Sequence, residues 1–172
     1  MTERTRGAVT ERTRRAVGGC VRRATRRDRD RVVELWLGLL AHHAPLDPHY
    51  RVRPGSEGEW RRLVERLLNR SDAAVFVWEE DGALLGFCSA QLEEAPSVLV
   101  EGSRAELTDL MVEPRARRRG IGRALVDAGA GWIRARGVER ITVRVASHNS
   151  EAQAFWRALG FGDFMDVLQR RG

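Results

Sequence analysis

Apolar residues recur every three or four positions in two stretches of the first half of the chain, a spacing that puts them on one face of an α-helix. In residues 28–44 they are Val32, Leu35, Trp36, Leu39 and Leu40, and in residues 57–69 they are Trp60, Leu63, Val64, Leu67 and Leu68. Pro45 and Pro48 end the first stretch, because proline lacks the N–H that a helix interior needs. The pattern predicts two successive amphipathic helices.

Shorter apolar runs predict strands. The predicted strands are 21–24, 74–78, 84–92, 106–112 and 140–146, and a last strand beginning at Gly160-Phe161. Asp81-Gly82 joins two of them, and this dipeptide favours a tight hairpin turn. Residues 95–104 are expected to form a loop, and further helices are expected at 121–136, which stops at Gly137, and at 150–159. The resulting order, β-αα-βββ-α-β-α-β, indicates a mixed α/β fold.

The segment Leu107–Gly122, LTDLMVEPRARRRGIG, combines a strand, a basic turn and a glycine-rich helix start. The first N–H groups of a helix have no internal partner and carry partial positive charge. Gly120 and Gly122 have no Cβ, so an oxyanion can approach those groups closely. The segment therefore predicts a site for phosphate or diphosphate, with an ordinary strand-to-helix turn as the alternative. It lacks the Lys-Ser/Thr of a Walker loop and the third glycine of a dinucleotide-binding turn.

Two motifs surround this turn. Residues 117–122 read RRRGIG and follow a strand that contains Leu110 and Val112 and closes at Pro114. Farther along, the chain has Asn149, Ala152, Phe155-Trp156 and Leu159-Gly160-Phe161. Both motifs resemble the GNAT superfamily of acetyl-CoA-dependent N-acetyltransferases, whose diphosphate loop is Gln/Arg-x-x-Gly-x-Gly/Ala. The resemblance implies a mostly antiparallel central sheet flanked by helices, with acetyl-CoA as co-substrate; no metal is expected.

By this resemblance, coenzyme A lies where the strands 106–112 and 140–146 splay apart. Its diphosphate is expected on the N–H groups of residues 117–122, and its pantetheine arm along the strand at Leu110 and Val112, whose N–H groups can polarise the thioester carbonyl. Asn149 is expected to bond the pantetheine, and it also suits a helix N-cap. The expected coenzyme-binding residues are Leu110, Met111, Val112, Arg117, Arg118, Arg119, Gly120, Ile121, Gly122, Arg123, Asn149, Ala152, Phe155 and Trp156.

Acetyl transfer needs a neutral amine, whereas an alkylamine has a pKa of about 10. A carboxylate near the strand would take the amine proton directly or through water. Glu106 is the first catalytic candidate, because it stands where histone-type family members place their catalytic Glu, and Asp109 is the second. The two have opposite strand parity, so both face the cleft only if the strand carries a bulge between them. A solvated strand position is the alternative for each.

One position departs from the family pattern. Many members have a Tyr that protonates the leaving thiolate where this chain has Trp156, and an indole N–H cannot deliver a proton usefully. Tyr50, the only tyrosine, is a candidate substitute, although proton return through water is favoured.

A cysteine and a cluster of histidines each allow a functional and a structural interpretation. Cys88 would suit an acetyl-cysteine intermediate, but a core position is favoured, because no His is near it in the sequence. His42, His43 and His49 gather near Asp47. Their spacing fits no standard metal-ligand pattern, so a polar pocket wall is favoured over a metal site.

The charge of the chain is concentrated at its start. All 30 basic residues are Arg; residues 1–31 hold 11 of them and 4 acids, a net of +7, whereas the remainder holds 19 Arg and 20 acids, a net of −1. The octet TERTRGAV at residues 2–9 recurs as TERTRRAV at residues 10–17. We predict a basic, disordered extension at residues 1–19 and an N-acetyltransferase domain at residues 20–172, with an arm for RNA or another anionic partner as the alternative.

No apolar run is close to the length that a membrane-spanning helix needs, and no signal peptide is visible. The two isolated cysteines fit neither a zinc site nor a disulfide framework. A cytoplasmic protein is therefore expected. The sequence predicts an N-acetyltransferase that transfers an acetyl group directly, in a ternary complex, to a primary amine, more readily of a small molecule than of a protein. The resemblance also implies a homodimer. Neither a membrane nor a nucleic acid is expected as a partner, because no apolar run is long enough to span a membrane and the net positive charge lies in residues 1–31 rather than in the remainder of the chain. The alternatives are acetylation of a protein N-terminus or lysine, RNA-directed acetylation, and a catalytically weak acyl-CoA-binding regulatory module.

Overall fold

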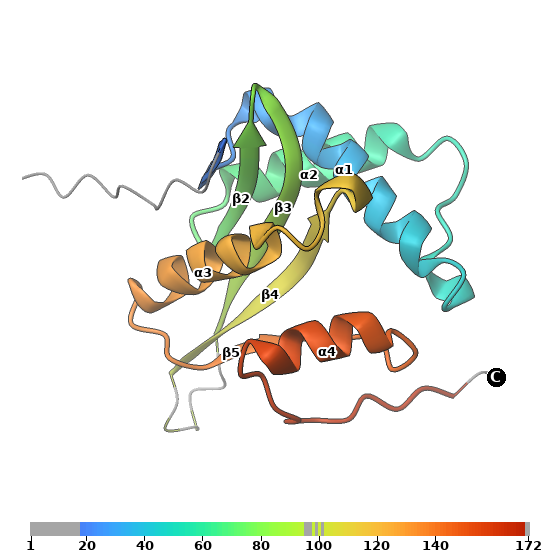
Figure 1. The fold of residues 1–172 in the computed structure, drawn as a ribbon. Helices are drawn as coiled ribbons and strands as arrows, with labels where there is room; N and C mark the ends of the chain where they lie inside the picture. The colour runs from blue at the N-terminus through green and yellow to red at the C-terminus, as the bar shows by residue number, and fades with distance from the viewer. Residues whose placement is uncertain (1–17, 95–97, 99, 101, 171–172) are drawn as a thin grey trace, which may run out of the picture.

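Five strands form one sheet in the order β1-β2-β3-β4-β5 in the computed structural model, which describes residues 18–94, 98, 100 and 102–170 (Figure 1). The strands are β1 (Gly19–Arg23), β2 (Ala73–Glu80), β3 (Ala83–Glu94), β4 (Ser103–Val112) and β5 (Ile141–Val143). Neighbours from β1 to β4 are antiparallel, and β5 is parallel to β4. The expectation of a mixed, mostly antiparallel sheet is therefore confirmed.

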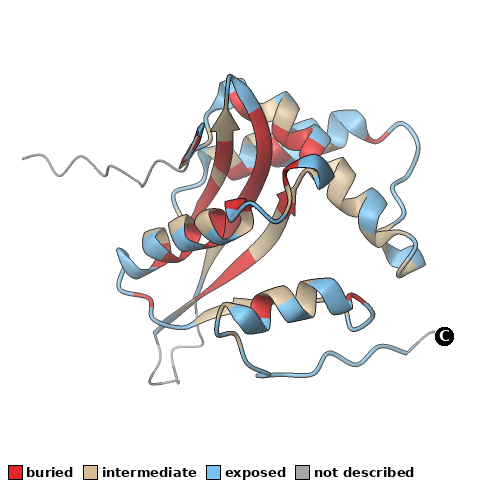
Figure 2. Ribbon diagram, in the orientation of Figure 1, coloured by how far each residue is buried: buried red, intermediate tan, exposed pale blue. Residues whose placement is uncertain are grey.

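Helices lie on both faces of this sheet. They are α1 (Arg29–His43), α2 (Glu57–Asn69), α3 (Ile121–Arg134) and α4 (Ser150–Ala158), with short 3-10 turns η1 (Arg26–Asp28), η2 (Pro48–Tyr50) and η3 (Pro114–Ala116). One apolar cluster joins α1 and α2 to the first face, through residues such as Val32, Val64 and Phe87. The other joins α3 and α4 to the opposite face, through Leu125 and Trp156 among others. Figure 2 shows the buried positions running along the central strands between these two layers.

The hairpin between β2 and β3 turns at the predicted dipeptide. Asp81 and Gly82 have φ values of 50° and 75°. A two-residue turn with positive φ at both central positions matches the twist of the flanking strands, and Asp-Gly adopts it readily. The hairpin brings β3 beside β2, and β3 is the middle strand of the five.

A bulge interrupts β4 at Thr108. Ser89 of β3 pairs with Asp109, whereas the next residue, Ala90, pairs with Leu107, so Thr108 is the extra residue. A bulge of one residue reverses the alternation of side chains beyond it. Consequently, Leu107 and Leu110 both pack in the cluster of α3, although they are three positions apart.

The structure corrects the end of the predicted order. Residues 161–170 form no strand, and the predicted strand 140–146 is reduced to Ile141–Val143. After α4 the chain turns back beside it, where Arg157 and Asp163 form an exposed ion pair (2.8 Å). Phe161 packs against the core cluster of α3 and α4, whereas the apolar residues after it are largely exposed, with Phe164 60% and Leu168 93% accessible.

Smaller differences concern the ends of other segments. β1 begins at Gly19, one residue before the predicted start of the domain, while residues 1–17, with most of the predicted extension, lie outside the described residues. Much of the predicted loop 95–104 also lies outside them, and its last two residues belong to β4.

Candidate active site

The strands β4 and β5 are paired only along the first half of β4 and separate beyond it. Their ladder consists of the pairs Ala105–Ile141, Glu106–Thr142 and Leu107–Val143. Among the described residues, β4 has no strand partner on this side from Thr108 to Val112. Because every second residue in such an edge points both its N–H and its C=O outward, the edge can pair with an extended, amide-bearing molecule. Leu110, Met111 and Val112 lie in it, as the sequence predicted.

The chain leaves β4 through a tight turn that is built to expose backbone N–H groups. Gly120 caps α3 with a φ of 82°, and Arg118 has a φ of 62°. Positive φ at Arg118 costs free energy, because Arg has no side-chain feature that favours this conformation. A Cβ placed on Gly120 would meet no atom within 4 Å, so the space in front of the helix start is open. The first N–H groups of α3 therefore face an accessible, positively polarised space.

The arginines of this turn are not equivalent. Arg119 Nη2 donates to both carboxylate oxygens of Glu80, at 2.9 and 2.7 Å, and Arg117 Nε donates to the carbonyl of Val112 at 3.2 Å. Both side chains thus fix the turn to the sheet. In the described part of the chain, Arg118 and Arg123 have no acidic partner. These two, rather than all the arginines of the turn, supply the uncompensated positive charge that the sequence predicted here.

Aromatic residues of α4 lie beside the same turn. The Cβ of any residue replacing Gly122 would stand 3.3 Å from the ring of Phe155, so glycine allows α4 to approach α3 closely. Trp156 is 9% exposed and packs edge-on against Phe155 and Phe161, with ring centroids 5.3 and 5.1 Å away. Trp156 therefore lies in the core cluster of α3 and α4, and Phe155 lies closer to the turn.

Asn149 stands at the start of α4 and joins two distant helices. Its Oδ1 accepts a hydrogen bond from the N–H of Ala152 at 3.0 Å, which is the predicted N-cap. Its Nδ2 lies 3.1 Å from Nε2 of His43, the last residue of α1. Burial, aided by the nearby His42, lowers the pKa of His43 below its ordinary value. Nothing in the local sequence of either helix points to this contact.

The bulge at Thr108 meets the condition under which both candidate carboxylates share a face. Glu106 lies opposite Gln91, and Asp109 lies opposite Ser89, on the face that carries α1 and α2. Glu106 is 6% exposed and forms an ion pair with the exposed Arg144 at 3.1 Å. Ser89 Oγ donates to Asp109 at 2.8 Å.

Burial raises the pKa of both carboxyl groups. For Glu106 the loss of solvation is opposed by Arg144 and reinforced by Glu93 and Asp109. For Asp109 it is opposed by hydrogen bonds from Ser89, Thr108 and Trp36. A base works best with a pKa that approaches the working pH, so raised values suit proton transfer. Ser89 and Arg144 were not identified from the sequence, because their contacts with Asp109 and Glu106 depend on strand register and tertiary structure.

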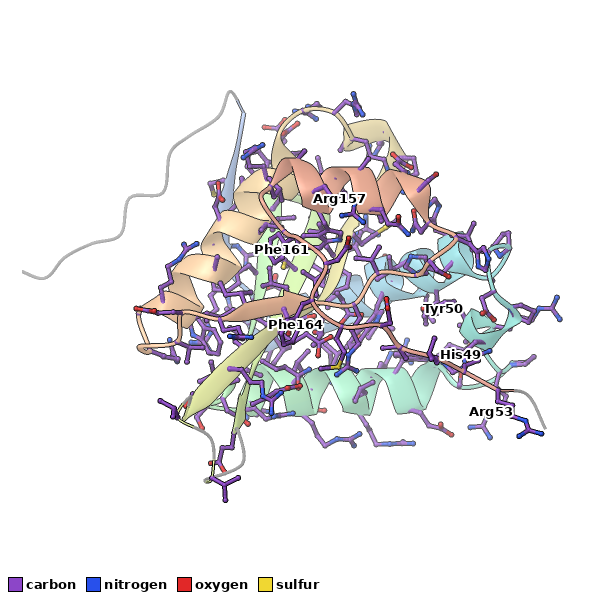
Figure 3. The ribbon with its side chains drawn as sticks, turned by 90° about the horizontal axis from the view of Figure 1, so that it is seen from below. His49, Tyr50, Arg53, Arg157, Phe161 and Phe164 are labelled. Atoms are coloured by element: carbon purple, nitrogen blue, oxygen red, sulfur yellow. The ribbon has the colours of Figure 1, made fainter. Side chains whose placement is uncertain are left out.

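The other candidates occupy different places. Cys88 is fully buried on the α3 face, and burial raises the pKa of its thiol, which fits the predicted core position. His49 and Tyr50 lie in η2, and His43 stacks on Tyr50 with ring centroids 4.9 Å apart. Figure 3 shows His49 and Tyr50 close together at the right of the view, with Phe161 and Phe164 nearer its centre. Within the described ranges, no group of three or more His, Cys, Asp or Glu residues is arranged to hold a metal ion.

Comparisons with known proteins show the family of the chain. A family model for the acetyltransferase (GNAT) family matches residues 40–161. The chain is similar to a mycothiol acetyltransferase of Thermobispora bispora, with 32% identity over 149 residues, which cover 80% of this chain and 46% of that protein. It is also similar to the peptidyl-lysine N-acetyltransferase YiaC of Escherichia coli, with 31% identity over 144 residues and 82% of both chains covered.

A solved structure supports the fold. An aminoglycoside N-acetyltransferase, AAC(6')-Iy, in complex with CoA matches with a TM-score of 0.70 and 22% identity, over 92% of this chain and 97% of that chain. At this identity the likeness is one of fold. The chain spans about half the length of the mycothiol acetyltransferase that it matches. None of the helices in the described ranges is long and apolar enough to cross a membrane.

Proposed function

Because the chain belongs to the acetyltransferase (GNAT) family, we propose that it transfers the acetyl group of acetyl-CoA to a primary amine, directly and in a ternary complex. One juxtaposition carries the proposal: an anion-binding helix start and two carboxylates of raised pKa lie along the same strand, where β4 and β5 part. Acetyl-CoA supplies the activated acetyl thioester. The residues of this chain hold the coenzyme and remove the amine proton.

The residues at the parting of the strands fit the coenzyme. The N–H groups of residues 117–122 hold the diphosphate, with Arg118 and Arg123 adding charge. The free edge of β4 pairs with the amides of the pantetheine arm, and the outward N–H groups of Leu110 and Val112 orient the thioester carbonyl. Asn149, Ala152 and Phe155 border the arm from the side of α4.

Glu106 acts as the general base in this proposal. Glu106 belongs to the middle pair of the short β4–β5 ladder, two residues before the free edge that begins at Thr108. Because burial raises its pKa, the ionised form binds a proton more strongly than an ordinary carboxylate does. Asp109 lies on the same face and is the second candidate, directly or through a water. The proton that the leaving thiolate needs comes from solvent, because Trp156 carries no useful acid.

The acceptor is a small-molecule amine in this proposal, and its main rival is a protein lysine. The relatives include one named for each class, mycothiol and peptidyl-lysine. A homodimer and a cytoplasmic location belong to the same proposal. Light scattering on the purified full chain gives its mass in solution and tests the dimer.

A direct experiment tests the activity. The full chain is incubated with acetyl-CoA and panels of small amines, peptides and RNA, with free thiol and acetylated product both measured. Thiol release that depends on an amine, together with acetylated amine as the product, supports the proposal. Tight binding of acetyl-CoA without product in any panel would instead identify a regulatory acyl-CoA-binding module. The presence of Trp156, where many family members have the proton-donating Tyr, is the reason for considering this alternative.

A further inference from the structure

A hollow of about 780 Å³ opens beside α2, on the face of the sheet that carries the two carboxylates. Its lining combines apolar surface from Trp36, Leu63 and Leu67 with the polar end of Gln91. Gln91 lies directly opposite Glu106 in the β3–β4 ladder, so the two side chains emerge side by side on one face. The side chain of Trp36, which lines the hollow, also lies near Asp109 and opposes the rise of its pKa. Neither carboxylate lines the hollow, so Gln91 and Trp36 are the residues that connect the hollow to the two candidate bases.

Positive charge dominates the wall of this hollow. Arg62, Arg66 and Arg70 line it at intervals of four residues, and Glu65 is the one acid in the lining. Among the described residues, Arg62 and Arg66 have no acidic partner. Arg70 pairs with Asp72 at 2.6 Å and also donates to the side chain of Gln91 at 3.2 Å. Glu65 lies 3.7 Å from Arg29, which compensates it.

This arrangement has an energetic consequence. Like charges one turn apart on a helix repel each other and destabilise it slightly. Arg61, on the side of α2 that faces α1, is compensated by Asp30 at 3.3 Å, whereas the side that faces the hollow carries uncompensated charge. An anion placed between Arg62 and Arg66 would remove the repulsion and gain charge-assisted hydrogen bonds.

We propose that the hollow binds an anionic group of the acceptor, so that the substrate is a small amine that also carries a carboxylate or a phosphate. The anion lies against Arg62 and Arg66, and the amine extends past Gln91 to Glu106. Polycationic amines are poor substrates, because the arginines repel them. This inference rests on the proposed acetyl transfer for its chemistry, but the binding site can be measured without turnover.

Binding is measured by calorimetry on the full chain with coenzyme A present. O-phosphoethanolamine and β-alanine are compared with ethanolamine, β-alaninamide and putrescine, so that phosphate, carboxylate, neutral and cationic partners are separated. The expected result is binding of at least one of the two anionic amines about tenfold or more tighter than its neutral counterpart, weakening as salt is added. The tighter-binding anionic amine shows whether the anionic group of the acceptor is a phosphate or a carboxylate.

Variants assign the effect to the hollow. Arg62→Gln with Arg66→Gln should remove most of the preference for the anion and leave the binding of ethanolamine within about twofold, while Arg61→Gln serves as the matched control and should change neither. Equal binding of anionic and neutral amines by the wild type, or an anion preference that survives in the double variant, would overturn the inference. If anion binding behaves as expected but acetyl-CoA is turned over with no amine, the proposed function fails and the anion site stands.

Discussion

The side-chain amide of Asn149 donates a hydrogen bond to Nε2 of His43, 3.1 Å away, and so ties the start of α4 to the end of α1. The donor is fixed by the other end of the amide, because Oδ1 accepts from the N–H of Ala152. Nε2 must then be the unprotonated nitrogen of a neutral imidazole. The expected pantetheine-binding residue is thereby coupled to the segment that leads to Tyr50.

This contact makes the stability of the protein depend on pH. The pKa of His43 is lowered in the folded state, so the unfolded chain takes up the proton first as pH falls below about 6.5. The contribution of His43 to the free energy of unfolding is therefore intact above that pH and is lost as pH falls toward the lowered value. Urea unfolding at several pH values should show a smaller loss in His43→Gln, since Gln keeps an acceptor for Asn149 but does not titrate.

The exposed His148 provides the control for this experiment. His148→Gln makes the same substitution at an exposed residue that takes no part in the contact with Asn149, so it reports the effect of the substitution itself. Identical pH dependence in the wild type and His43→Gln would contradict the assignment of a neutral, hydrogen-bonded His43.

The helix start at Gly120 can be tested against a second glycine of the same conformation. Gly120→Glu should abolish measurable binding of coenzyme A, because a carboxylate would occupy the open space before α3. Gly137 also has a positive φ, 76° against 82°, and no atom within 4 Å of a Cβ. Gly137→Glu should therefore lose a similar stability, about 1–2 kcal/mol, yet bind coenzyme A normally in calorimetry. Undiminished affinity in Gly120→Glu would show that the diphosphate lies elsewhere.

Trp156 is expected to matter more for stability than for chemistry. It packs against Phe155 and Phe161, so Trp156→Ala should cost about 3–5 kcal/mol of unfolding free energy, and Trp156→Phe about 1–2 kcal/mol. Since a coenzyme A thiolate is a fair leaving group, with a thiol pKa of about 8.5, Trp156→Phe should keep most of kcat, and Trp156→Tyr should be tolerated. Steady-state rates and denaturant titrations on the same preparations separate the two effects. A collapse of kcat in a stably folded Trp156→Phe would assign it a role in the reaction.

The sequence predicted the parts of the fold that depend on local pattern. The amphipathic spacing of residues 57–69 gave the bounds of α2 as observed, and Asp81-Gly82 gave the hairpin turn. The bulge at Thr108 was considered as a condition but not located, because Leu107–Asp109 contains no glycine or other local bulge signal. The predicted final strand was wrong, because pairing with a sheet edge depends on tertiary contacts, and residues 162–170 are exposed and pair with no strand.

The residues of the candidate site also fall into those that a local motif indicates and those that only the tertiary structure brings together. Glycines, arginines and Asn149 stand in motifs of fixed spacing, so they were found from sequence. The partner of Asn149 lies 106 residues away in the chain, and the hollow beside α2 forms only when Gln91 is placed next to Glu106 by strand register. Contacts of this kind depend on topology and not on any local pattern.

The pH dependence of kcat/KM in the wild type and in Glu106→Gln, with one accepted amine, tests the central claim most directly. The account predicts that wild-type activity falls as pH drops through the raised pKa of Glu106, because a protonated carboxyl group cannot accept the amine proton. Glu106→Gln should lower kcat/KM by about 100-fold or more near neutral pH, lose that limb of the profile, and recover in part at high pH, where the amine is already neutral. A Glu106→Gln enzyme with the rate and profile of the wild type would contradict the account and direct attention to Asp109.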